Sequence, residues 1–194
     1  LFMGLIEPTE GDILVDGKKL TVETLSKWQK NIAHVPQAIF LTDASMAENI
    51  AFGVPLDKIN FERVKRSAQI AQISEFIEES QEGYNTIVGE RGVRLSGGQR
   101  QRIGIARSLY KDANILVFDE ATSALDNSTE QLVIKGINQL EDNITTFFIA
   151  HRLSTIIACD IIIELKDGRV IAQGTYDELL ETSPSFKDLH VDIS

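Results

Sequence analysis

Short, mainly apolar runs alternate along this chain with stretches in which apolar residues recur every three or four positions. The run at 115–118 has no polar alternation, which is typical of a strand buried on both faces of a parallel sheet, and the run at 32–35 predicts a strand that ends at Pro36. The run at 146–150 predicts another buried strand. Helical spacing over 61–79 and 98–110 places amphipathic helices between the strands. Together these patterns predict an α/β fold with a mainly parallel sheet and an inserted group of helices.

Turn residues refine this outline. Asp16-Gly17 ends a strand predicted over 12–16, and Asp167-Gly168 joins two apolar runs, at 161–165 and 169–173, into a β-hairpin. The chain after position 183 predicts a loosely held tail.

Three helix starts carry a capping-box pattern, in which a Ser or Thr is followed three residues later by Gln or Glu. The pairs are Ser96 with Gln99, Ser128 with Gln131, and Thr175 with Glu178. The second pair predicts a helix whose apolar face carries Val133, Ile137 and Leu140.

The 194 residues suit one globular domain, with 43% hydrophobic and 25% charged residues. No apolar run approaches the ~18 residues of a membrane-spanning helix. A net charge of −10 argues against a nucleic-acid partner. Arg100, Arg102 and Arg107 share one helix and are interpreted as a solvated face or an interface. Cys159 is expected to be a buried, inert thiol, and His34 is expected in the core.

Two adjacent carboxylates, Asp119 and Glu120, directly follow the strand at 115–118. The carboxyl ends of parallel strands are where α/β folds gather their chemistry. A carboxylate here could hold Mg²⁺, and its neighbour could polarise an attacking water molecule as a general base. Taken alone, the pair is equally compatible with an ordinary acidic turn.

Ser96-Gly97-Gly98 opens a helix whose first amides lack hydrogen-bond partners, and glycines let a phosphate approach that backbone. A simple helix cap would account for the same residue types. The longer run from Leu95 to Arg102, however, reads LSGGQRQR without a departure from the signature motif of ATP-binding cassette (ABC) proteins. With 115–120 as Walker B and 121–126 as the D-loop, the chain resembles the nucleotide-binding domain of an ABC transporter.

The resemblance divides residues 1–194 into a helical subdomain with the signature at about 45–110 and a catalytic part at about 111–182. It implies ATP and Mg²⁺ as cofactors and a dimer that sandwiches ATP between two nucleotide-binding domains. The implied catalytic residues are Glu120, His151 as the switch histidine, and Gln37 as the Q-loop glutamine. Asp119 and Gln37 are the implied metal ligands. The implied ATP-binding residues are Leu95, Ser96, Gly97, Gly98, Gln99, Asp126 and His151.

Residues 86–92 are similar to the X-loop of ABC exporters, although a polar turn between helices would have similar composition. In exporters Phe40 and Glu90 would contact a transmembrane domain, which is expected in the same chain. The resemblance therefore implies an ATPase that powers export from the cytoplasmic face of the cell membrane, with no nucleic-acid partner. Cargo choice belongs to the transmembrane part.

A complete ATP site needs a phosphate-binding loop, G-x-x-x-x-G-K-[ST]. Gly17-Lys18 does not qualify, because Asp12 replaces the earlier glycine and Lys19 replaces Ser or Thr. Residues 1–5 resemble the end of the helix that follows this loop. We therefore expect a fragment cut before Walker A, without its transmembrane domain, that does not turn over ATP by itself.

Two alternatives remain at this point. ABC-type ATPases of DNA repair, chromosome maintenance and translation carry similar motifs, but the exporter-like 86–92 segment and the acidic charge argue against them. The second alternative is a cassette that donates its signature face to a partner without hydrolysing ATP itself.

Overall fold

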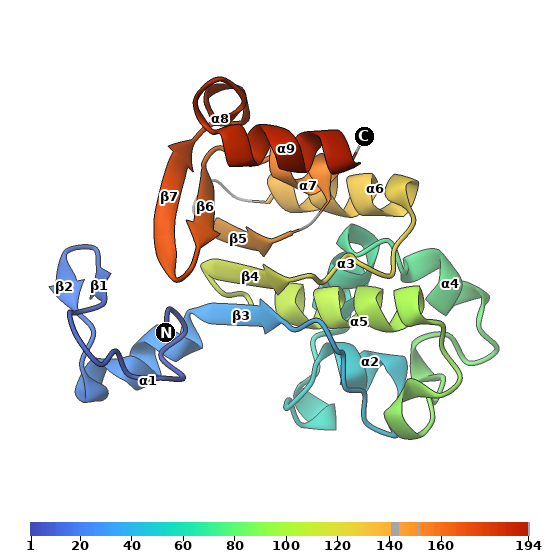
Figure 1. Ribbon diagram of the computed structural model, residues 1–194. Helices are drawn as coiled ribbons and strands as arrows, with labels where there is room; N and C mark the ends of the chain where they lie inside the picture. The colour runs from blue at the N-terminus through green and yellow to red at the C-terminus, as the bar shows by residue number, and fades with distance from the viewer. Residues whose placement is uncertain (141–143, 151, 194) are drawn as a thin grey trace.

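Three parallel strands form the centre of the molecule in the computed structural model, which describes residues 1–140, 144–150 and 152–193 (Figure 1). Their order is β3 (Ile32–Val35), β4 (Ile115–Asp119) and β5 (Thr145–Ile149). Ile32 lies opposite Ile115, which lies opposite Thr145. The predicted parallel sheet is therefore confirmed, and the central strand β4 delivers Asp119 to its carboxyl end.

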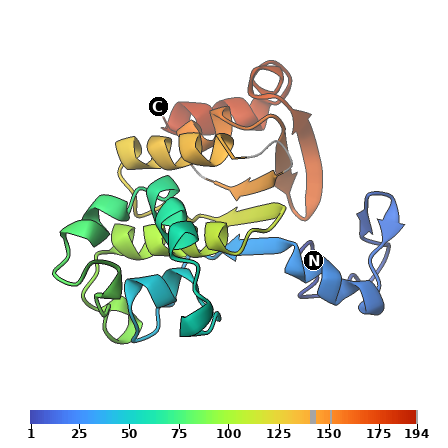
Figure 2. The ribbon, with the colours of Figure 1, turned by 180° about the vertical axis from the view of Figure 1, so that it is seen from behind.

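Helices pack against one face of this sheet (Figures 1 and 2). They are α5 (Gly97–Tyr110), with α2 (Met46–Ile50) and α3 (Phe61–Ile70) packed against it, and α6 (Asn127–Asn138), which contacts α3 and α7 (Leu153–Ile157). Leu116 and Phe118 of β4 join one buried core with apolar side chains of both α5 and α6. The opposite face of the sheet, which carries His34 and Ile149, is partly exposed.

The core joins the sheet to α5 and α6. Phe118 of β4 is buried and stacks on Phe148 of β5, with ring centroids 5.1 Å apart. Ile103, Ala106 and Tyr110 of α5 are buried, as their helical spacing predicts. This packing fixes α5, which carries the signature motif at its N-terminus, against the strand that carries the two carboxylates.

The remaining elements surround this centre. They are β1 (Leu14–Val15), β2 (Lys18–Lys19), α1 (Val22–Lys30), the 3₁₀ turns η1 (Leu56–Lys58), η2 (Gly83–Asn85) and η3 (Glu90–Gly92), α4 (Ser74–Glu79), β6 (Ile162–Lys166), β7 (Arg169–Gly174), α8 (Tyr176–Thr182) and α9 (Pro184–Ile193). Both predicted turns are confirmed, since antiparallel pairs β1–β2 and β6–β7 flank them. Within the described ranges, no helix combines the length and apolar character needed to cross a bilayer.

The single helix predicted over 61–79 is wrong, because the chain breaks between α3 and α4. Gln72 adopts the left-handed conformation with φ +56°, and the amide of Ile73 donates to the carbonyl of Ala68. This 6→1 hydrogen bond is the Schellman ending of a helix. Ala71 and Ile73 are both fully buried, so the break lets the apolar residues on either side of Gln72 enter the core.

Strand β5 is not buried as predicted. It is an edge of the three-stranded sheet, and its side chains alternate between exposed and half-buried, with Ile149 52% exposed. His34 is likewise exposed rather than in the core, since side chains in β3 point to alternate faces.

Two boundaries also differ from the sequence prediction. Helix α6 begins two residues earlier than expected, because Asp126 rather than Ser128 caps it. The chain beyond Ser183, expected to be loosely held, forms α9, whose Phe186 is buried against Tyr176.

Candidate active site

The two candidate carboxylates lie where β4 leaves the sheet. Asp119 is the last residue of β4, and Glu120 has φ +48°, a left-handed conformation that is costly for a residue with a side chain. Two hydrogen bonds hold this backbone: the Glu120 amide donates to the Ile149 carbonyl at 3.0 Å, and the Ser123 amide donates to the Glu120 carbonyl at 3.1 Å. These two hydrogen bonds therefore hold Glu120 in its strained conformation. The chain leaves the direction of β4 at this residue, directly after Asp119.

Gln37 meets Glu120 across the sheet. Its Nε2 donates to Oε2 of Glu120 at 2.6 Å, although the residues are 83 positions apart. An ionised carboxylate only accepts hydrogen bonds, so the amide nitrogen must be the group that faces it. The structure thus brings together two of the three candidate catalytic residues at the carboxyl ends of β3 and β4. The third, His151, lies outside the described residues.

Few side chains at this edge of the sheet could bind a metal ion. Among the described residues, no group of three or more His, Cys, Asp or Glu side chains is arranged to hold a metal ion. Asp119 and the amide oxygen of Gln37 are oxygen donors of the kind Mg²⁺ prefers, and Mg²⁺ commonly takes one or two protein ligands together with substrate phosphates. The residues present fit Mg²⁺ better than a metal that requires a full protein cage.

The signature segment forms the predicted helix start. Ser96 caps α5 by accepting from the Gln99 amide at 3.2 Å, while the Gln99 side chain accepts from the Ser96 amide at 2.8 Å. Leu95 is buried in the core, its amide donates to the Gly92 carbonyl and its carbonyl accepts from Arg100. The predicted capping box is confirmed, and the half-buried Gly97 and Gly98 are the first two residues of the helix.

Gly98 allows the 121–126 loop to lie directly on this helix. A Cβ at Gly98 would come within 3.0 Å of the Ala124 carbonyl oxygen. Beside this contact is a hollow of about 470 Å³ lined by Ser96, Gly97, Gly98, Arg102, Ala124, Leu125, Asp126 and Thr129. The candidate ATP-binding residues of the signature and the loop therefore share one surface.

On that surface, Asp126 is the N-cap of α6. Its carboxylate accepts from the Ser128 hydroxyl at 2.5 Å and from the amide and hydroxyl of Thr129 at 2.9 and 2.8 Å. These hydrogen bonds hold the pKa of Asp126 well below its usual range. The side chain is thus an ionised cap of α6.

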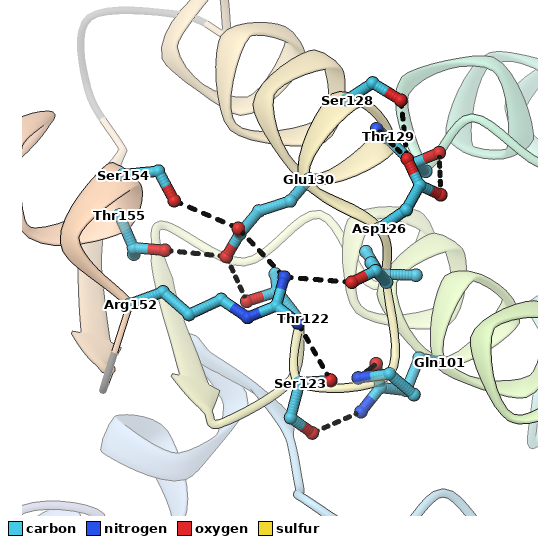
Figure 3. A network of polar contacts seen from close by, with 12 residues as sticks. Gln101, Thr122, Ser123, Asp126, Ser128, Thr129, Glu130, Arg152, Ser154 and Thr155 are labelled. Atoms are coloured by element: carbon cyan, nitrogen blue, oxygen red, sulfur yellow. Dashed lines mark hydrogen bonds and ion pairs between the residues drawn. The ribbon is translucent and has the colours of Figure 1, made fainter. Parts of the chain in front are cut away.

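The sequence analysis missed a buried polar network behind the loop, shown in Figure 3. Glu130 is fully buried, and its carboxylate accepts from the hydroxyls of Thr122, Ser154 and Thr155 at 2.7, 3.0 and 2.9 Å. Arg152 adds a salt bridge at 3.1 Å. Burial alone would raise the pKa of Glu130, but the four donors outweigh it and the pKa is lowered. A Glu in the first turn of a polar helix start gives no local sign of such burial.

The candidate membrane-domain contact Phe40 lies beside Arg107 of α5, which also donates to Asn49 of α2. Phe40 is 60% exposed and Glu90 is exposed in η3. Arg107 donates to the Phe40 carbonyl at 2.9 Å and lies over the ring of Phe52, another exposed aromatic residue. Arg107 therefore joins Phe40 and Phe52.

The arginines of α5 are not a solvated face. Arg100, Arg102 and Arg107 are half-buried, and each donates to a backbone carbonyl, for example Leu95, Gln72 and Asn49. Cys159 is half-buried rather than buried, and desolvation, followed by the charge of Asp160, raises its thiol pKa. A raised pKa disfavours the reactive thiolate.

Comparisons with known proteins agree with this geometry. Residues 1–123 match the family model described as ABC transporter. The chain is 44% identical over 186 residues to the ATP-dependent lipid A-core flippase of Methylococcus capsulatus, covering 96% of this chain and 31% of the relative. It is 46% identical over 189 residues to the beta-(1→2)glucan export ATP-binding/permease protein NdvA of Rhizobium etli, covering 97% and 32%.

Among solved structures, a bacterial Atm1-family ABC exporter with ATP bound superposes with a TM-score of 0.91 and 39% identity, covering 98% of this chain and 33% of that one. The chain spans about a third of the length of these relatives. The match extends through both strands that carry Gln37 and the carboxylates and through the intact signature helix. This chain belongs to the ABC transporter family, as an ATPase domain of the exporter type.

Proposed function

We propose that this chain is the ATP-hydrolysing part of an exporter in which two such domains sandwich ATP and drive a transmembrane domain in the same polypeptide. The observation that carries the proposal is the hydrogen bond between Gln37 and Glu120 at the carboxyl ends of neighbouring strands. The relatives named as a flippase and as an export ATP-binding/permease protein support the transport role.

Glu120 acts as the general base in this proposal. Its carboxylate accepts from Gln37 and its backbone is held between β5 and the Ser123 amide, so the group is kept in one position. A carboxylate with a fixed position can take a proton from water as that water attacks the terminal phosphate. Gln37 orients the carboxylate without adding a charge.

Asp119 and the oxygen of Gln37 would hold Mg²⁺. When bound, this ion neutralises the charge that the phosphates carry during transfer. The chain supplies the position of its ligands, because residues 32–35 of β3 pair with residues 115–118 of β4 and Asp119 pairs with Ile149 of β5.

The signature residues would act on ATP held by a second domain. Among the described residues, the hollow beside Ser96, Gly97 and Gly98 is lined from α5, α6 and the 121–126 loop, and Gln37 and Glu120 do not line it. Two separated half-sites on one chain are what a dimer needs if each ATP touches both subunits. Leu95, Gln99 and Asp126 would shape this surface. His151 is proposed to contact the terminal phosphate.

Phe40 and Glu90 are the proposed contacts for the transmembrane domain. An exposed aromatic ring beside a second one at Phe52 offers apolar area to a partner helix, and Glu90 adds a charge at the edge. This arrangement would put the chain at the cytoplasmic face of the membrane.

The test is Glu120→Gln in the full-length transporter. The amide keeps the shape of the side chain but cannot accept the proton, so ATP hydrolysis should fall by at least about a hundredfold while ATP binding persists. A closed dimer with trapped ATP should accumulate, detectable by size-exclusion chromatography and retained nucleotide. Glu62→Gln, on the exposed surface of α3 beside Lys65, is the matched control.

Hydrolysis by Glu120→Gln at the parental rate would refute the general-base role. A wild-type protein that binds nucleotide but never hydrolyses it would instead favour a domain that only donates its signature face.

A further inference from the structure

The 121–126 loop, which connects Glu120 to the cap of α6, is held from several sides by side chains that are distant in sequence. From α5, Gln101 donates to the Ser123 hydroxyl at 3.0 Å and accepts from the Ala124 amide at 2.8 Å. From the segment before α7, Arg152 donates to the carbonyls of Leu125 and Ser123 at 2.9 and 3.1 Å. Such a loop would otherwise be free to move, since Ser123 and Ala124 are exposed.

Arg152 is itself braced from behind. The nitrogen that donates to Leu125 also lies 3.1 Å from the buried carboxylate of Glu130 (Figure 3). The planar guanidinium fork can serve a carboxylate and two carbonyls at once, which a lysine ammonium on a flexible stem cannot do in the same geometry.

Burying the charge of Glu130 costs free energy, which indicates that its network with Arg152 has a function other than stability. A buried ion pair is often no more stabilising than apolar residues of the same volume. Here the carboxylate is fully buried and accepts from three hydroxyls as well as from Arg152. Such a complete network fixes one arrangement of the groups it joins.

The network reaches Glu120 through the backbone. Arg152 holds the Ser123 carbonyl, and the amide of the same residue donates to the Glu120 carbonyl. Thr122, between them, donates its hydroxyl to Glu130. The strained turn at Glu120 is therefore linked through Ser123 and Thr122 to Arg152 and Glu130.

We propose that Arg152, braced by Glu130, is a positioning residue for ATP hydrolysis: it fixes the 121–126 loop and, through Ser123, the backbone of Glu120. The inference rests on the proposed function, since it concerns the rate at the same carboxylate. Arg152 also directly follows His151, the candidate phosphate contact, in the sequence.

The first test measures ATP hydrolysis by the full-length transporter carrying Arg152→Lys, Glu130→Gln or both. Displacing a reacting group by about 1 Å can cost about a hundredfold in rate, so kcat should fall by about ten- to a hundredfold. The KM for ATP should change by less than about twofold, because positioning of the base is lost and not ground-state binding. The double variant should be about as slow as either single variant, because both act through one network.

Arg63→Lys is the matched control. Arg63 pairs with Asp112 and lies over Tyr110, away from the loop. Arg152→Ala should resemble Arg152→Lys, since the proposal requires the fork and not only the charge. Restoration of parental kcat by lysine, an increase in KM alone, or additive losses in the double variant would each overturn the proposal.

The second test does not depend on activity. Amide hydrogen exchange of the peptide covering 119–126 in the nucleotide-free, full-length protein should speed up in Arg152→Lys and in Glu130→Gln but not in Arg63→Lys. Gln101→Ala provides the positive control, because it removes the hydrogen-bond acceptor of the Ala124 amide. Unchanged exchange in both network variants would overturn the positioning role. If Glu120→Gln hydrolyses ATP normally while exchange speeds up as expected, the proposed catalytic role fails and the structural bracing stands.

Discussion

Replacing Asn49 with alanine tests whether one buried amide holds the segment after β3 onto the signature helix. Asn49 has no exposed surface. Its oxygen accepts from the Thr42 amide at 3.0 Å and from Arg107 at 3.2 Å, and its nitrogen donates to the carbonyls of Thr42 and Ser45, each at 3.1 Å. The same side chain therefore links the chain beyond Phe40 to α5.

The magnitude follows from these four hydrogen bonds. At a net value of about 1 kcal/mol each, their loss costs about 4 kcal/mol. Alanine is the better helix former in α2 and returns about 0.7 kcal/mol. We expect Asn49→Ala to lower the free energy of unfolding by about 3 kcal/mol. Asn60→Ala removes an identical side chain that caps α3 through one hydrogen bond at 3.1 Å, and should cost about 1 kcal/mol.

Urea unfolding followed by circular dichroism compares the two variants on the same protein. The midpoint should shift about three times further for Asn49→Ala than for Asn60→Ala, with equal dependence on denaturant. Equal shifts would refute the reasoning, because they would mean that burial and multiple partners add nothing to the amide at position 49.

Two further predictions concern the loop and its brace. Gly98→Ala would place a Cβ 3.0 Å from the Ala124 carbonyl oxygen and should speed amide exchange over 121–126, whereas Gly97→Ala, whose Cβ would meet Ala124 at an ordinary 3.6 Å, should leave that exchange unchanged. The lowered pKa of Glu130 means that its ionised form stabilises the folded state above the ordinary value of 4.5 and that this contribution is lost as the pH falls below it. The difference in unfolding free energy between wild type and Glu130→Gln should therefore be largest above about pH 5 and should narrow in acid; a constant difference from pH 7 to pH 3 would contradict the assignment.

Local signals in the sequence were sufficient where a few neighbouring residues determine the structure. The capping boxes at Ser96 and Thr175 both form, and Asp167-Gly168 joins β6 to β7. The apolar runs at β3 and β4 are parallel neighbours, so the sequence also located Gln37 and Glu120 at one edge of the sheet.

Where two local solutions compete, tertiary packing decides. Asp126 and Ser128 can both cap a helix, and the structure uses Asp126 with Ser128 as one of its donors. The break at Gln72 has no Gly or Pro to announce it; it forms because Ala71 and Ile73 both enter the core.

The contact between Glu130 and Arg152 could not be predicted from neighbouring residues in the sequence, for a similar reason. Glu130 is recognisable as buried only when Arg152 and Thr155, 22 and 25 positions away, are placed beside it. A sequence pattern describes neighbours along the chain, whereas a buried charge is stabilised by neighbours in space.

The contact between Gly98 and Ala124 has a thermodynamic consequence for a protein with two ATP sites. Gly98 and Gln101 belong to the helix that would touch one nucleotide, and the loop they contact begins at the carboxylate that would act on the other. If a nucleotide bound at this helix changes the affinity of the loop's own site by some factor, then a nucleotide bound at that site must change the affinity at the helix by the same factor. Communication between the two sites would require no separate relay, because in each subunit the two hydrogen bonds of Gln101 join α5 directly to the 121–126 loop beside Gly98.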